Sequence, residues 1–316
     1  MDSSLTLRAR WAVLSKPQAD SSDYRVLVCS DGPSATAWFE RVVRDTLFGT
    51  PPPWSVTGRP GETLPWISFG VCDSAAAVSG VRWVTVSVTD WNSLVEATWD
   101  SSGRRSATTR CFLVPYEHVA RHRTGLVSLW NAVRPVRLPP EPAGSPASVL
   151  LTVETDHVER TARLVDELGF DWVAATAAVA LEMPLALAAP GDRFALTRIG
   201  TIDAVASLLP FGYRAALTAS TWAPDATATT PWICYTRASS PWRLQVREGV
   251  PPEPASERAR AHLAQLRILR NEFGTIGLLR ALAERTAPAS FPGSDGTRRR
   301  TRTSADVHLE GYRWKS

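Results

Sequence analysis

Segments patterned like helices alternate with segments patterned like strands after residue 147, and this alternation restricts the fold more than any other feature of the chain. Residues 147–153 resemble a strand, residues 156–168 an amphipathic helix and residues 184–189 a further strand. Such alternation is typical of sheets covered by helices. We therefore predict a fold of the α/β or α+β class, with mixed sheets and helices arranged in two domains.

Residues 202–222, IDAVASLLPFGYRAALTASTW, show the same order on a smaller scale. We expect a helix over residues 203–208, a corner at residues 210–213 and a strand over residues 214–222. Arg214 is the one charge within the apolar part of this run. Because an unpaired buried charge is costly, a central strand would require Arg214 to meet a carboxylate or a ligand. We favour the carboxylate.

Proline-rich breaks divide the chain into segments of different composition. We predict an α+β N-terminal domain over residues 1–134, a proline-rich linker over residues 135–147 and a second, α/β domain over residues 148–250. A helical segment follows over residues 251–285. Residues 286–316 are polar and basic, and we expect them to form a tail that is loosely ordered or that orders on a partner.

Residues that can cap or end helices refine this outline. Ser34 and Ser256 each stand just before a helical pattern, where a serine side chain can accept from a free backbone amide. A single helix is expected over residues 116–133. The four cysteines are widely spaced among apolar neighbours, so we expect small buried side chains rather than a disulfide framework or a zinc site.

Composition and charge exclude several classes of protein. No run of about 18 apolar residues is present, so a membrane span is not expected. The N-terminus lacks the pattern of a signal peptide, which makes the cytoplasm the expected location. From residue 298 onward, six basic residues stand against two acidic ones, which gives +4 and equals the net charge of the whole chain. The body is therefore neutral, which argues against a basic face for nucleic acid.

Recognisable catalytic and cofactor motifs are missing. The chain has no GxxxxGK[ST] loop, no GxGxxG turn after a strand and no GxSxG elbow, and Lys16 and Lys315 are its only lysines. We predict no cofactor. His118 and His122 lie four residues apart on an expected helix, a spacing that can hold a metal, but no third ligand is evident nearby. We favour a solvent-facing pair and predict no metal.

Tryptophan and arginine supply the candidate interaction residues. The chain has 13 tryptophans, and aromatic side chains beside loops often anchor interfaces, although a place in the core is the more expected one for any single tryptophan. The RRRTR run in the tail could contact phosphate, although a solvated tail is the interpretation we favour. Besides Arg214, the candidates are Trp54, Trp66, Trp91, Trp99, Arg298, Arg299, Arg300 and Arg302.

Several phrases together resemble a family of actinobacterial proteins associated with NTP-dependent conflict systems. The phrases include RWAVL at residues 10–14, LPW at residues 64–66, ELGF at residues 167–170 and the run at residues 203–222. The family is that of the proteins similar to GTPase-associated protein one. The resemblance implies an accessory scaffold in a bacterial defence module and carries over no catalytic residue.

The functional prediction is a non-catalytic adaptor or regulatory subunit in a bacterial defence or signalling module. Its expected partner is a protein, by the resemblance an NTPase or GTPase. The alternative is a hydrolase that acts on nucleic acid or nucleotide, with Asp90 or Asp100 as unrecognised catalytic acids. Binding of nucleic acid through the basic tail is a third, less favoured interpretation.

Overall fold

A mixed sheet of ten strands, flanked by helices, organises the chain in an α/β fold. The computed structural model describes residues 4–16, 24–47, 65–73, 81–91, 107–138, 146–154, 158–188, 195–223, 231–236 and 241–292. The strands are β1 (Ser4–Ser15), β2 (Arg25–Cys29), β3 (Trp66–Asp73), β4 (Arg82–Trp91), β5 (Ala107–Pro115), β6 (Val149–Glu154), β7 (Leu185–Ala188), β8 (Ala219–Ser220), β9 (Ile233–Tyr235) and β10 (Leu244–Arg247). Nine of them lie in the order β10-β7-β9-β8-β3-β4-β5-β1-β2, and β6 pairs with the first half of β1.

The predicted α/β class is confirmed, but the strands do not divide into two domains. Strand β3 pairs antiparallel with β8, and β1 pairs antiparallel with β6. Each pair joins a strand from before residues 135–147 to one from after them. One hydrophobic cluster also runs from Trp11 on β1 to Leu282 near the C-terminal end of the described chain. The sheet and the core are thus continuous across the expected linker, of which residues 139–145 lie outside the described part.

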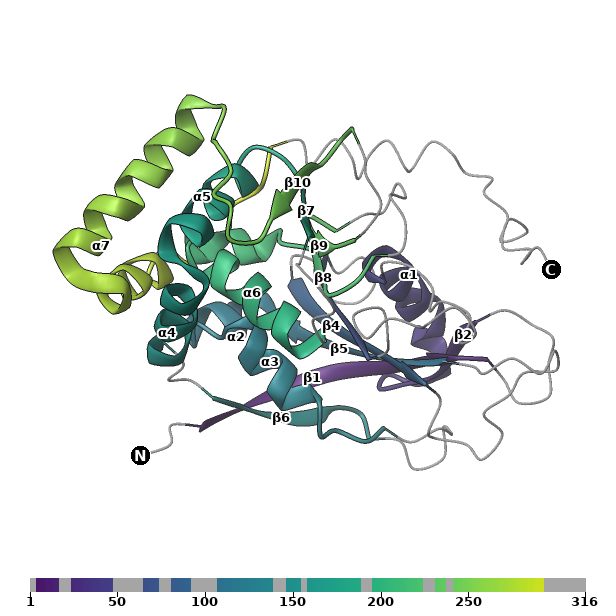
Figure 1. Cartoon of the computed structure of the whole chain (residues 1–316). Helices are drawn as coiled ribbons and strands as arrows, with labels where there is room; N and C mark the ends of the chain where they lie inside the picture. Colours follow the sequence, from purple (N-terminus) through teal and green to yellow (C-terminus); the bar gives the residue numbers. More distant parts are fainter. Residues whose placement is uncertain are drawn as a thin grey trace.

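Helices cover both faces of the sheet. They are α1 (Thr36–Thr46), α2 (Tyr116–Arg121), α3 (Leu126–Val133), α4 (Val158–Leu168), α5 (Phe170–Ala180), α6 (Ala195–Ser207) and α7 (Glu257–Ala283). Side chains alternate along a strand, so Trp11 and Val13 of β1 enter the cluster that contains α2 to α7, while Ala12 enters the cluster with α1. Figure 1 shows α4 and α5 lying between α7 and the rest of the molecule.

The structure breaks the expected helix at residues 116–133 into α2 and α3. Arg123, between them, has φ of 52°, and its amide donates to the carbonyl of Ala120. This left-handed residue ends α2, because it turns the chain out of the helical path. The predicted cap at Ser34 is also wrong: a short 3-10 turn, η1 (Pro33–Ala35), precedes α1, and no side chain caps it.

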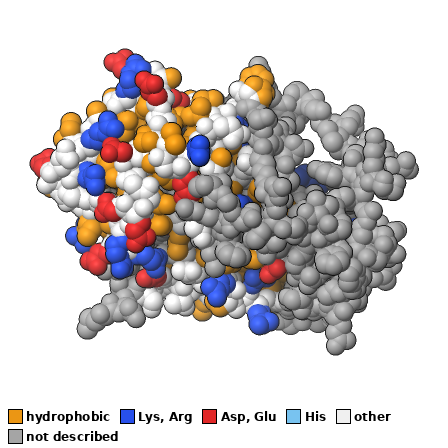
Figure 2. All heavy atoms as spheres, in the orientation of Figure 1, with side chains coloured by type: hydrophobic (Ala, Val, Ile, Leu, Met, Phe, Trp, Pro, Cys, Tyr) orange, Lys and Arg blue, Asp and Glu red, His pale blue; other side chains and the backbone are white. Residues whose placement is uncertain are grey.

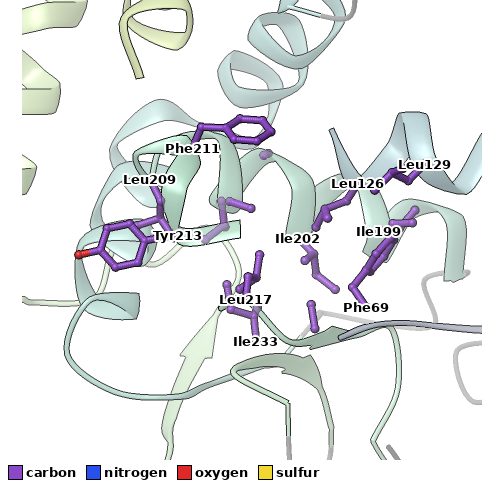
Figure 3. Packing of buried hydrophobic residues seen from close by; sticks show 14 of the residues in the cluster. Phe69, Leu126, Leu129, Ile199, Ile202, Leu209, Phe211, Tyr213, Leu217 and Ile233 are labelled. Atoms are coloured by element: carbon purple, nitrogen blue, oxygen red, sulfur yellow. The ribbon is translucent and has the colours of Figure 1, made fainter. Parts of the chain in front are cut away.

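Residues 202–222 follow the predicted order only in part. The helix is α6, which is longer than expected. A 3-10 helix, η4 (Phe211–Ala215), takes the place of the first part of the predicted strand, leaving only β8. Figure 3 shows side chains of this region meeting Leu126 of α3 and Ile233 of β9 in the core. Arg214 therefore stands on a helical turn rather than a strand.

The C-terminal helical segment is confirmed as α7, and Ser256 caps it as predicted, with its Oγ accepting from the amide of Ala259 at 3.2 Å. Gly274, with φ of 67° and ψ of 175°, bends α7 within its length. A backbone of this kind is nearly restricted to glycine, which has no Cβ.

The segment that leaves α7 is better ordered than expected for a tail. Residues 285–291, which we call the strap, pack against η4, and the amide of Gly212 donates to the carbonyl of Arg285 at 2.8 Å. The side chain of Phe291 is buried. The prediction of a loose tail from residue 286 is thus wrong for residues 286–292, and residues 293–316 lie outside the described part.

Candidate anion-binding pocket

The candidate interaction residues fall at different places in the structure. Trp66 on β3 is only 3% exposed, and its ring lies 6.4 Å from that of Trp222. It packs in the interior, the position expected for any single tryptophan, rather than on the surface where an interface anchor would lie. Trp91 ends β4, and its side chain is outside the described part. Also outside the described residues are Trp54, Trp99, Arg298, Arg299, Arg300 and Arg302.

Arg214 is buried, as predicted, and has the carboxylate partner that its burial requires. Its Nη2 lies 3.4 Å from Oδ1 of Asp203 on α6, and the two side chains are 8% and 4% exposed. Its guanidinium also lies over the ring of Phe211, 4.5 Å from the ring centre. Burial lowers the pKa of Arg214, and the nearby Asp203 opposes that effect. The ion pair therefore keeps a charged group inside the protein.

The carboxylate of Asp203 is shared with the start of α3. Its Oδ1 accepts from the amide of Leu126 at 2.8 Å and its Oδ2 from the amide of Val127 at 3.2 Å. Both amides belong to the first turn of the helix, where no intrahelical acceptor is available. Asp203 thus binds two amides at shorter distances than the guanidinium. Within the described residues, Nε of Arg214 is buried without a hydrogen-bond partner.

A pocket of about 320 Å³ lies against this arginine. Arg121 and Arg123 at the end of α2, Arg280 of α7 and Arg214 all line it, and Glu284 is its one acidic lining residue among those described. The other lining residues are His122, Val158, Thr161, Ser207, Leu209, Phe211, Leu279 and Ala283. The lining has four arginines and one glutamate, so it carries an excess of positive charge that favours an anion, even though Asp203 neutralises Arg214.

The backbone at Arg123 gives a second reason to assign the pocket a role. A left-handed conformation costs a residue with a Cβ roughly 1–2 kcal/mol relative to a right-handed one, so glycine or asparagine usually ends a helix in this way. Arginine stands there instead, and its guanidinium reaches Glu284 at 3.7 Å across the pocket. Unusual backbone at a pocket wall is typical of functional positions.

The start of α4 also faces the pocket, through Val158 and Thr161 in its first turn. The first turn of a helix carries free amides and a partial positive charge, which favours bound anions. Three arginines on the rim, one at the base and a helix start thus surround the same space. Its apolar walls, which include Leu209 and Phe211, can hold the uncharged part of a small ligand.

Of the two acids named for a hydrolase, Asp90 does not line this pocket. Asp90 lies on β4, where it raises the pKa of Arg110 while burial lowers that pKa overall, and Asp100 is outside the described residues. His118 and His122 are both partly exposed, and only His122 lines the pocket. No cluster of three metal-ligating side chains occurs among the residues described.

Comparisons with known proteins give no match to this chain, whether with family models, curated proteins or solved structures. The resemblance to proteins similar to GTPase-associated protein one therefore remains a prediction. Within the described ranges, the helices lack the combined length and apolar character needed to cross a membrane.

Sequence reasoning singled out Arg214 but missed the rest of the pocket. Arg121 and Arg123 at the end of α2 lie far along the chain from Arg280 of α7, and no shared motif links them. One local signal was present, because arginine stands at 123 where a helix end favours glycine. It becomes informative only when the end of α2 is known.

Proposed function

We propose that this chain is a regulatory binding protein of the adaptor class, and that it recognises an anionic group in the arginine-lined pocket. One observation carries the proposal: Arg214 lies buried at the pocket with a single, long contact to a carboxylate that also binds two backbone amides.

The argument rests on how buried arginines are normally satisfied. A guanidinium has five N–H donors, and buried donors are nearly always hydrogen-bonded because desolvating them is costly. A purely structural arginine would be expected to place several of these donors on protein oxygens. Arg214 has its contact with Asp203 and leaves Nε unpaired among the described residues. A phosphate or carboxylate in the pocket would supply the missing hydrogen-bond acceptor.

The adaptor part of the proposal concerns a protein partner, which by the resemblance is an NTPase. Support comes from α7, which leaves Ile268, Phe273 and Ile276 exposed at 62%, 56% and 37%. Figure 2 shows apolar side chains scattered among basic and acidic ones on the part of the surface that it colours. Such a mixed surface is typical of contacts between separately folded proteins. The pocket lies at the C-terminal end of α7, so a bound anion would lie close to this exposed surface of the same helix.

Anion binding is tested by thermal unfolding of the full chain in inorganic phosphate and, separately, in acetate, against chloride at equal ionic strength. We expect phosphate to raise the melting temperature in a saturable way, because a ligand that binds only the folded state stabilises it. A larger effect of acetate would assign the pocket to carboxylates instead.

Substitutions on the rim locate the site. Arg121→Gln and Arg280→Gln change exposed side chains, so both variants should fold, and each should weaken phosphate binding about tenfold, as expected for a lost charge-assisted hydrogen bond. Arg267→Gln is the matched control, because Arg267 is exposed and pairs with Asp171 away from the pocket. The proposal fails if neither anion binds saturably, or if the control loses as much affinity as the rim variants.

A further inference from the structure

We propose that the surface under the strap is a docking groove for an extended peptide segment with an aromatic anchor, presented by a partner protein and mimicked here by the chain's own residues 285–291. The groove is formed by Gly212 and Tyr213 of η4, Trp232 before β9 and Tyr116 of α2. This inference is independent of the anion pocket.

The strap is held largely by its backbone. The amide of Gly212 donates to the carbonyl of Arg285 at 2.8 Å, and the carbonyl of Gly212 accepts from the amide of Ala289 at 3.0 Å. The hydroxyl of Tyr116 donates to the carbonyl of Thr286 at 2.8 Å. Backbone pairing of this kind accepts many sequences, which is how peptide-binding proteins commonly gain affinity.

Gly212 is required by the closeness of the two backbones. A Cβ built at Gly212 would lie 1.8 Å from the carbonyl oxygen of Ala287, which is far inside contact distance. Because the obstacle is a backbone atom, a side chain cannot move aside to relieve it. The surface is therefore shaped for a peptide backbone that passes directly over Gly212.

One aromatic side chain anchors the strap. The ring of Phe291 stacks on Trp232 at 4.6 Å between ring centres and lies 5.0 Å from Tyr213. Figure 3 shows Tyr213 and Phe211 leaving the same turn in different directions, so η4 contributes to the groove and to the anion pocket on separate sides. An aromatic anchor in an aromatic pocket gives specificity to the backbone pairing.

The strap is weakly committed to the fold. Of its seven side chains only that of Phe291 is buried, and those of Arg285, Ala287, Pro288 and Ser290 are exposed. A segment with a single buried side chain gains little from packing to offset the entropy lost on ordering. Phe291 belongs to the edge of the main hydrophobic cluster, so we expect the strap to open locally by releasing this one ring, and a competing segment with the same anchor to take its place.

The test uses the full chain and a labelled peptide of residues 285–292, RTAPASFP, with binding followed by fluorescence anisotropy. Phe291→Ala removes the anchor of the resident strap and should open the groove. We expect this variant to bind the peptide at least about tenfold more tightly than the wild-type chain does. The same peptide with alanine at the anchor should not bind.

Two further variants keep the test decisive. Phe291→Ala combined with Gly212→Ala should lose peptide binding, because the added Cβ occupies the place of the peptide backbone. Ser290→Ala, an exposed strap position, is the control and should behave as wild type. Should Phe291→Ala fail to fold, Tyr116→Phe serves instead, since it loosens the strap and leaves the anchor in place.

Hydrogen exchange in the wild-type chain gives an independent measurement. Residues 285–292 should exchange faster than α7, because the strap opens locally. The proposal is overturned if a folded Phe291→Ala chain does not bind the peptide, if the peptide without its anchor binds equally well, or if the strap exchanges as slowly as α7. A concentration-dependent dimer that Phe291→Ala abolishes would also overturn it, since the groove would then serve strap exchange between two copies.

Discussion

Asp203→Asn should destabilise the protein strongly, because it removes the charge that balances Arg214 while keeping the shape of the side chain. Asp203 and Arg214 are 3% and 7% exposed, so both charges are largely shielded from water. Breaking a buried ion pair from one side typically costs about 3–5 kcal/mol. The asparagine oxygen can still accept from Leu126 or Val127, so we expect a loss of about 3–5 kcal/mol rather than more.

Urea unfolding followed by circular dichroism measures this loss, and Asp171→Asn is the matched control. Asp171 makes the same kind of pair with Arg267, but the two side chains are 62% and 53% exposed. An exposed pair contributes about 0–1 kcal/mol, so the control should hardly change the midpoint. The reasoning is refuted if the two variants lose similar stability.

A double variant that changes both Arg214 and Asp203 distinguishes the effect of an unbalanced charge from the effect of altered packing. Arg214→Met together with Asp203→Asn removes both charges, while the asparagine oxygen can still accept from the amide of Leu126 or Val127. We therefore expect the double variant to be more stable than Asp203→Asn. Phosphate should also stabilise Asp203→Asn more than the wild-type chain, because an anion in the pocket can replace the lost carboxylate.

Two further predictions concern the buried thiols and the bend in α7. Burial raises the pKa of Cys111 and of Cys234 to about 11 from the ordinary 9.0, so neither thiol should react with a disulfide reagent at pH 8 until the protein unfolds. The pKa of each thiol is higher in the folded protein than in the unfolded chain, so the stability linked to these thiols is complete below pH 9 and is lost as the pH rises toward 11. Urea unfolding midpoints measured across that pH range would show this loss. Gly274→Ala should cost about 1–3 kcal/mol, because φ of 67° with ψ of 175° is strained for any residue with a Cβ. The control is Gln265→Ala on the exposed face of α7, which should leave the free energy of unfolding within about 0.5 kcal/mol of wild type. Gly277→Ala is not suitable as a control, because its Cβ would lie 2.5 Å from that of Phe273.

The sequence determined the local elements where the pattern was regular. The strand pattern of residues 147–153 predicted β6, and Ser256 before a helical pattern predicted the cap of α7. The sequence also predicted that Arg214, if buried in a central strand, would need a carboxylate or a ligand, and it meets the carboxylate of Asp203 although it stands on η4. The first two inferences rely on neighbours in the chain, and the third relies on the cost of burying a charge, which any fold must meet.

Tertiary structure decided how the elements join and where the pocket and the groove lie. The pairing of β3 with β8 merged two expected domains, because a strand pattern specifies which face is buried but not which strand lies beside it. The rim arginines meet only because α2 and α7 end at the same place. Gly212 looked like part of a simple corner in the sequence, and only the strap passing over it shows why no larger residue fits there.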